Sequence, residues 1–168
     1  MQVIDQSGYQ LPRSVKKILL IQLGDIGDVV WTTPAIRAAK NTIPGAQVSV
    51  MVKEGFGGLL EADPSIKQVF EIKRHLGNPL HQAAGQLSFL KSIRAQRFDL
   101  VIDLRLGDRG AFLSFLTGAP IRVTMHHPEG VPFWRKYFFT HGVVPHPRPG
   151  NYGAADQTLC FLRGLGID

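Results

Sequence analysis

Two glycines and two aspartates stand together where an apolar segment ends. The stretch from residue 16 to 40 reads KKILLIQLGDIGDVVWTTPAIRAAK, and Gly24, Asp25, Gly27 and Asp28 separate its apolar start from a helix-like continuation. Glycine lets the backbone adopt positive φ or approach a ligand closely. An aspartate at such a turn can cap the following helix, or it can act as a general base at the mouth of a cleft. The residue types leave both roles open.

The spacing of the glycines disfavours two common nucleotide sites. A dinucleotide-binding turn requires GxGxxG, whereas this chain has GDIGD, and a carboxylate in a phosphate cradle would repel the phosphate. No GK[ST] follows, so the turn is not a P-loop either. An NAD-dependent domain is therefore disfavoured.

Short apolar segments alternate with helix-like ones along the chain. Residues 17–23, 47–52, 68–72 and 99–104 are apolar at consecutive positions, as central parallel strands are. Helices are predicted over 32–42, 83–96, 110–118 and 153–166. The alternation predicts an α/β fold with a Rossmann-like open, mostly parallel sheet and flanking helices. Ligands bind such sheets at the carboxyl ends of the strands, where the two aspartates lie.

Two details of the predicted helices are specific. Pro34 falls in the first turn after Thr32 or Thr33, which favours a helix start there. In the segment 83–96, Leu87, Leu90 and Ile93 recur with Ala83 at helical spacing, which predicts that they lie on one face of the helix.

Length and composition favour one globular domain. At 168 residues the chain suffices for a Rossmann-like domain over 16–168, preceded by an N-terminal extension over 1–15. The single cysteine, Cys160, excludes an internal disulfide framework, which favours a reducing cytoplasm. No secretory signal is visible, and no apolar run approaches the roughly 18 residues of a membrane span. The six histidines lack metal-ligand spacing and are predicted to lie on the surface, so no metal site is expected.

The positive charge is concentrated in the middle of the chain. The net charge is +6, and eleven of the 19 Lys and Arg residues but only four of the 13 acidic residues lie between positions 73 and 148. Such a basic face attracts nucleic acid, anionic lipid or phosphorylated sugars, or is simply a solvated surface.

An irregular region with five prolines spans residues 125–149. It contains the segment FWRKYFF at 133–139. Its aromatic rings could contact a membrane surface, with Arg135 and Lys136 on anionic lipid. The structural alternative is an edge strand whose aromatic side chains lie in the core.

The order of motifs after residue 15 resembles the lipopolysaccharide heptosyltransferases of glycosyltransferase family 9. The motifs are the GD dyad, the helix TTPAIRAAK, the passage VxxGFxxLLExxPxIxxVxxI, FDLVIDLR and the closing LxFLRGLGI. The resemblance implies a GT-B enzyme, in which two Rossmann-like domains face each other across a cleft. The N-terminal domain receives the acceptor, and the C-terminal domain binds the nucleotide-sugar, typically ADP-heptose. This chain is similar to the first only, so the C-terminal nucleotide-sugar domain is expected to be absent from it.

The resemblance also implies roles for particular residues. Asp28 matches the base that activates the acceptor hydroxyl in an inverting transfer, without metal or cofactor. The expected acceptor-binding residues are Gly27, Asp25, Lys73, Arg74, Arg105 and Arg109. The expected partners are the nucleotide-sugar donor, held by the absent domain, and a lipopolysaccharide core acceptor. Peripheral contact with the inner membrane from the cytoplasm is also expected, and nucleic acid is not. The fragment alone is expected to be inactive.

The chain departs from the family pattern in three places. Many members have Ser or Thr where this chain has Asp25, and Lys or Arg where it has Gln22. A second carboxylate so close to Asp28 could raise the pKa of one of the two, or compete as the base. A histidine that often precedes the final helix is replaced by Tyr152 and Gly153. The alternative function is a stand-alone sugar-binding or anion-binding module without catalysis.

Overall fold

The computed structural model describes residues 1–5, 9–73, 79–126, 132–145 and 153–168. The strands are β1 (Gln2–Ile4), β2 (Lys17–Ile21), β3 (Gln47–Lys53), β4 (Ile66–Ile72), β5 (Leu100–Asp103), β6 (Ile121–Met125) and β7 (His141–Val143). The α-helices are α1 (Ile26–Trp31), α2 (Thr33–Thr42), α3 (Pro79–Ala95), α4 (Asp108–Leu116) and α5 (Ala154–Arg163). Two short 3-10 helices are η1 (Gly57–Leu59) and η2 (Phe133–Tyr137).

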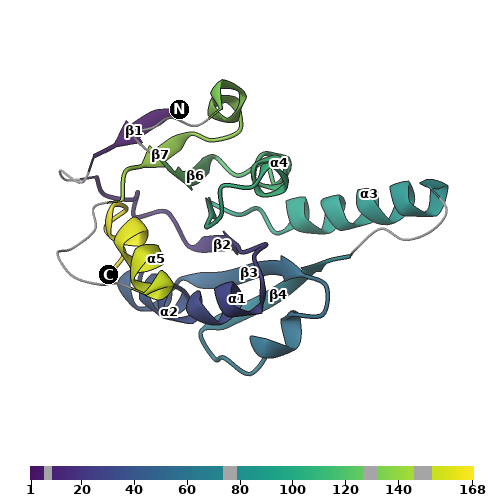
Figure 1. Ribbon diagram of the computed structural model, residues 1–168, viewed down its shortest axis with the longest axis horizontal. Helices are drawn as coiled ribbons and strands as arrows, with labels where there is room; N and C mark the ends of the chain where they lie inside the picture. The colour runs from purple at the N-terminus through teal and green to yellow at the C-terminus, as the bar shows by residue number, and fades with distance from the viewer. Residues whose placement is uncertain (6–8, 74–78, 127–131, 146–152) are drawn as a thin grey trace.

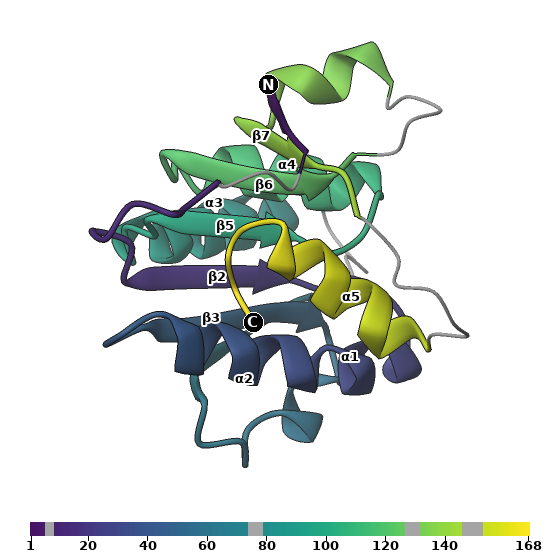
Figure 2. The same cartoon turned by 90° about the vertical axis from the view of Figure 1, so that its left-hand side faces the viewer.

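The seven strands form one sheet in which every paired neighbour is parallel. Their order is β1-β7-β6-β5-β2-β3-β4, so the chain starts at one edge, enters the centre at β2, fills one side and then returns to the other. Helices α1, α2 and α5 cover the face turned to the viewer in Figure 2, and α3 and α4 lie behind the sheet. The mostly parallel Rossmann-like sheet with flanking helices is therefore confirmed.

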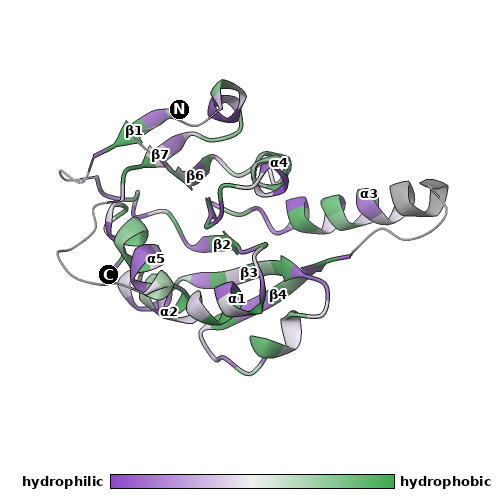
Figure 3. Cartoon of the chain, viewed as in Figure 1, coloured by the Kyte–Doolittle hydropathy of each residue, from purple (hydrophilic) through white to green (hydrophobic). Residues whose placement is uncertain are grey.

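Both faces of the central strands are buried, which is why their apolar residues are consecutive. Ile18 and Leu20 point to the layer that holds α2 and α5, whereas Leu19 and Ile21 point to the opposite layer. All four side chains are fully buried. The covering helices carry both hydrophobic and hydrophilic residues, as an amphipathic helix on a sheet does (Figure 3).

Three strands escaped the sequence prediction because their apolar runs are very short or are interrupted by polar residues. Ile121–Met125 and His141–Val143 form β6 and β7, and Gln2–Ile4 forms the edge strand β1. The last of these lies within the residues assigned to an N-terminal extension, and its Ile4 belongs to the core.

The apolar face predicted for α3 is only partly buried. Ile93 is buried, but Leu87 is 54% exposed. Figure 1 shows the N-terminal part of α3 extending away from the sheet, so the helical periodicity there has no neighbour to meet. Among the described residues, no helix is both long enough and apolar enough to cross a bilayer.

The segment FWRKYFF is not an edge strand, so that prediction is wrong. Residues 133–137 form the 3-10 helix η2, seen as the green coil at the top of Figure 1, and the chain enters β7 only at His141. Arg135 is 1% exposed and therefore does not reach lipid, whereas Lys136 is exposed. His141 is part-exposed, and its ring lies against Tyr9.

Candidate functional site

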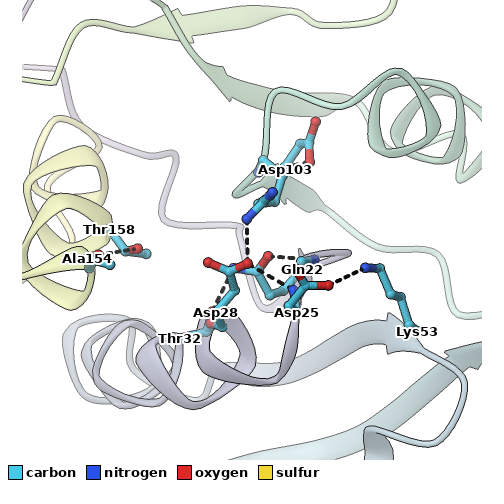
Figure 4. A network of polar contacts seen from close by, with 10 residues as sticks. Gln22, Asp25, Asp28, Thr32, Lys53, Asp103, Ala154 and Thr158 are labelled. Carbon is cyan, nitrogen blue, oxygen red and sulfur yellow. Dashed lines mark hydrogen bonds and ion pairs between the residues drawn. The ribbon is translucent and has the colours of Figure 1, made fainter.

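The carboxyl ends of β2, β3 and β5 bring four charged side chains together. Asp25 and Asp28 follow β2, Lys53 ends β3, and Arg105 follows β5. They lie at the edge of the sheet where parallel α/β folds bind ligands. Figure 4 shows the two aspartates at the turn between β2 and α1, with Lys53 beside them.

The buried side chain of Gln22 holds the turn between β2 and α1 in place. Its side chain is buried, its amide nitrogen donates to Thr32 Oγ1 at 3.0 Å, and its carbonyl oxygen accepts from the Gly24 amide at 3.1 Å. Thr32 Oγ1 in turn donates to the Asp28 carbonyl at 2.8 Å. The residue that departs from the family's Lys or Arg is thus a structural amide that ties the end of β2 to α1.

Asp28 caps the following helix, which is one of the two roles that the sequence left open, and it also contacts an arginine. It is the third residue of α1, and its Oδ2 accepts the Asp25 amide at 2.9 Å, as the acidic residue of a capping box does. The same oxygen contacts Nη1 of Arg105, which reaches across from β5. The Asp28 side chain is 24% exposed and the Arg105 side chain 48% exposed. The carboxylate is therefore fixed in position and still open to solvent.

Asp25 is held differently. It precedes α1 at the N-cap position, and its side chain, 88% exposed, pairs with Lys53 at 3.0 Å. The hydrogen bond and charge of Lys53 hold the pKa of the Asp25 carboxyl below its usual value. The neighbouring carboxylate therefore does not raise the pKa of Asp25. The two acids are drawn to different strands, Asp25 to β3 and Asp28 to β5.

Gly24 explains how the Asp28 carboxylate fits. A Cβ at Gly24 would lie 2.1 Å from Asp28 Oδ2, so the carboxylate occupies the space that a side chain would fill. At Gly27 a Cβ would meet only the Trp31 ring at 3.9 Å. Neither glycine has positive φ. The two glycines therefore do not form a phosphate cradle. Gly24 instead leaves the space that the Asp28 carboxylate occupies.

A buried ion pair lies behind Arg105. Asp103, the last residue of β5, accepts the Arg105 amide at 3.3 Å and faces Nη2 of Arg135 at 3.4 Å. Both side chains of this pair are almost fully buried. Arg135 also donates to the Leu106 carbonyl, so it fastens the loop that carries Arg105. Burial raises the pKa of the Asp103 carboxyl to about 7, although the Arg105 amide and the Arg135 charge favour its ionised form.

The other basic residues named from the sequence lie further out. Lys73 follows β4 and is exposed, and Arg109, on the first turn of α4, donates to the Lys73 carbonyl at 3.4 Å. The structure thus places Arg109 and Lys73 next to each other. Arg74 lies outside the described residues.

Three residues of the site region were not predicted as site residues from the sequence. Lys53 ends a strand beside β2, so the rule that parallel strands end at one edge could have found it. Asp103 stands in the quoted motif FDLVIDLR, two positions before Arg105. Its partner Arg135 is 32 residues further on, and no local signal joins the two. Among the described residues, no three His, Cys, Asp or Glu side chains are arranged to hold a metal ion.

The sheet order and these side chains define the class of protein. It is a Rossmann-like domain in which an aspartate pairs with an arginine at the carboxyl ends of the strands. Solved structures have the same fold. An E. coli heptosyltransferase WaaC with ADP-2-deoxy-2-fluoro heptose superposes with a TM-score of 0.74 at 21% identity, covering 90% of this chain and 49% of that one. A family 9 glycosyltransferase from Veillonella parvula gives a TM-score of 0.73 at 24% identity, covering 91% of this chain and 42% of that one. This chain therefore has the fold of the part of these structures that it covers, which is less than half of each.

Sequence comparison points to the same proteins. Lipopolysaccharide heptosyltransferase 3 of Escherichia coli is 31% identical over 144 residues, which are 84% of this chain and 41% of that protein. Lipopolysaccharide heptosyltransferase 1 of Pseudomonas aeruginosa is 26% identical over 132 residues, 73% of this chain and 37% of that protein. No family model matches the chain. The resemblance to the lipopolysaccharide heptosyltransferases is therefore confirmed, and the chain spans about two fifths of the length of these relatives.

Proposed function

We propose that this chain is the acceptor-binding, N-terminal half of a heptosyltransferase-like inverting enzyme. The enzyme would transfer heptose from ADP-heptose to a lipopolysaccharide core acceptor. The observation that carries the proposal is the Asp28 carboxylate, held by the Asp25 amide and Arg105 at the carboxyl end of β2 and still open to solvent. The relatives' names supply the reaction class.

In this reaction Asp28 would accept the proton of the acceptor hydroxyl. The hydroxyl oxygen then forms the new bond to the anomeric carbon, and the bond from that carbon to the nucleotide diphosphate breaks on the opposite side, with inversion. A positioned general base of this kind contributes about 10² to 10⁴ in rate. Asp25 is the weaker candidate, because its partner Lys53 lowers the pKa of its carboxyl and so makes it a weaker base.

The basic residues would bind the anionic groups of the acceptor. Core acceptors carry phosphates and sugar carboxylates, which an arginine binds with two parallel hydrogen bonds. Arg105 is the central candidate because it is half exposed and already contacts Asp28. An acceptor phosphate would compete with Asp28 for this guanidinium. Lys73, Arg109, Arg74 and Gly27 remain proposed acceptor contacts around it.

The donor would be held outside these residues. We place the acceptor-binding domain at 16–168 and the nucleotide-sugar site in a second domain, corresponding to the part of the relatives that this chain does not cover. The chain by itself would then bind acceptor without turnover.

Substitution of the two aspartates in the complete two-domain enzyme tests the assignment of the base. We expect Asp28→Asn to lower kcat by about 10² to 10⁴, with little change in acceptor KM, because Asn retains the shape but takes no proton. Asp25→Asn, the matched control on the same turn, should lower kcat much less. Equal activity of the Asp28 variant and the wild type in a heptose-transfer assay would disprove the role.

Acceptor binding can be measured on the chain itself. Titration with phosphorylated core oligosaccharide should shift the amide resonances of the turn around Asp28 and the loop around Arg105. Arg105→Ala should weaken this binding about tenfold, the loss of one charge-assisted contact. Lys91→Ala, an exposed change on α3, serves as the control. Binding that ignores Arg105, or that shifts resonances elsewhere, would contradict the proposed acceptor site.

A further inference from the structure

A cluster of aromatic side chains outside the site is exposed on α4 and η2. Phe112 and Phe115 of α4 are 51% and 47% exposed, and Phe133 and Tyr137 of η2 are 74% and 76% exposed. We call these four residues the aromatic patch. At about 200 Å² per ring side chain, roughly 500 Å² of aromatic surface faces solvent, which is the size of a functional patch on a monomer.

The patch is built on packed rings and is not a set of scattered residues. Trp134 stacks on Phe112 with ring centroids 6.1 Å apart, and Phe138 lies 4.8 Å from Phe112 and 5.4 Å from Phe115. Trp134 and Phe138 are part-buried and join η2 to α4. Phe112 and Phe115 therefore pack on Trp134 and Phe138, the direct chain neighbours of Phe133 and Tyr137.

Cationic side chains accompany the patch. Lys136 lies on η2 between Phe133 and Tyr137 and is exposed, and Arg109 is exposed one turn before Phe112 on α4. The guanidinium of Arg122 lies over the Phe115 ring at 5.7 Å. The exposed acid described on these two elements is Asp108, which is 3.6 Å from Arg135. The surface around the rings is thus positive.

We propose that the aromatic patch is a docking surface for an anionic lipid bilayer. Aromatic rings are favoured at the headgroup level, and each Lys or Arg near an anionic leaflet adds about 1 kcal/mol of attraction, or about fivefold in binding. A second copy of the chain is the less suitable occupant, because a two-fold contact would bring Lys136 and Arg109 against like charges.

The patch has a direct structural link to the candidate site. Arg135, between Trp134 and Lys136, donates to the Leu106 carbonyl and pairs with Asp103, so η2 is fastened to the loop that carries Arg105. A bilayer on the patch would therefore hold the loop of Arg105 close to the lipid surface. The docking itself does not require sugar transfer and can be tested without an activity assay.

Vesicle sedimentation of this chain tests the docking. We expect binding to vesicles of phosphatidylcholine mixed with phosphatidylglycerol, and little binding to phosphatidylcholine alone. The double variant Phe133→Ser, Tyr137→Ser should weaken binding about tenfold or more, and Lys136→Gln about fivefold. Leu87→Ser and Lys91→Gln are the matched controls on α3, where Leu87 is similarly exposed, and both should bind as the wild type does.

The two tryptophans report which surface touches the lipid. Trp134 lies beneath the patch, whereas Trp31, 49% exposed, lies on α1. With brominated lipid, the Trp31→Phe variant should retain fluorescence quenching and the Trp134→Phe variant should lose it. The proposal is overturned by absence of binding, by patch variants that bind normally, by quenching of Trp31 instead, or by patch variants that change only self-association.

Discussion

At the scale of single residues, the site depends on a close contact between one glycine and one carboxylate. Asp28 Oδ2 fills the space where a Gly24 Cβ would stand, and from there it reaches both the Asp25 amide and Arg105. The glycine is required by this contact and not by its backbone angles. The second glycine of the motif, Gly27, carries no such restriction.

Alanine substitution of the two glycines should therefore have different effects. Gly24→Ala should lower the free energy of unfolding by about 1 to 3 kcal/mol, because the Asp28 carboxylate must move and its capping bond is lost. Gly27→Ala should stay within about 1 kcal/mol of the wild type or exceed it, since alanine favours a helix. Urea unfolding of both variants checks the contrast. A Gly24→Ala variant as stable as Gly27→Ala would contradict the packing argument.

At the scale of elements, the connection from α3 to β5 contains an unfavourable backbone conformation. Arg97, the second residue after the end of α3, has φ of 52°, in the left-handed region that a β-carbon disfavours. Gly118, which follows α4, has φ of 74° and is the residue type that this conformation favours. Two helices on the same face of the sheet thus end in similar turns with different residues.

Exchanging the residue types at these turns should change stability in opposite directions. Arg97→Gly should raise the free energy of unfolding by about 0.5 to 1 kcal/mol, the strain released less the added freedom of the unfolded glycine. Gly118→Ala should lower it by about 1 kcal/mol, since the nearest side-chain atom to the new Cβ, at 3.7 Å, leaves only the strain. Thermal melting of both variants measures this. A destabilised Arg97→Gly variant would show that the arginine side chain contributes more than its backbone strain.

At the scale of the whole molecule, the buried pair of Asp103 and Arg135 joins the end of the central strand β5 to the 3-10 helix η2. The two residues come from β5 and η2, and both are almost fully buried. Removing two charges from water is unfavourable unless the pair is well hydrogen-bonded. The raised pKa of Asp103 is the measurable sign of that burial.

Stability should depend on pH through Asp103. Its pKa is about 7 in the folded state and near 3.8 in the unfolded chain, so between these values the folded state binds the extra proton. The stability that Asp103 contributes should therefore fall as pH rises through this window. Compared with Asp103→Asn, which stays neutral, the wild type should lose about 2 to 3 kcal/mol between about pH 5 and pH 7.5. The difference between the two cancels other titrating groups. A constant or rising difference would contradict a raised pKa.

Local patterns were sufficient to predict the centre of the fold and to propose where a site lies. The consecutive apolar residues of β2 to β5 predict a parallel sheet because both faces of such strands are buried, and the sheet places its ligands at the carboxyl ends. Strands β1, β6 and β7 were missed, because β1 and β7 have only three residues each, and Arg122 and Thr124 interrupt the apolar run of β6. The exposure of Leu87 was missed because a helix pattern does not say whether a neighbour is present.

The sequence by itself determined the α/β class, the turn with Asp25 and Asp28, and the resemblance to heptosyltransferases, because each depends on neighbouring residues or on motif order. Only the tertiary structure decided how the charges pair. Lys53 draws Asp25 toward β3, Arg105 reaches Asp28 from β5, and Arg135 is buried against Asp103. These partners are 28, 77 and 32 positions apart. Such pairs form only when the sheet order brings distant strand ends together, which no local pattern of residue types encodes.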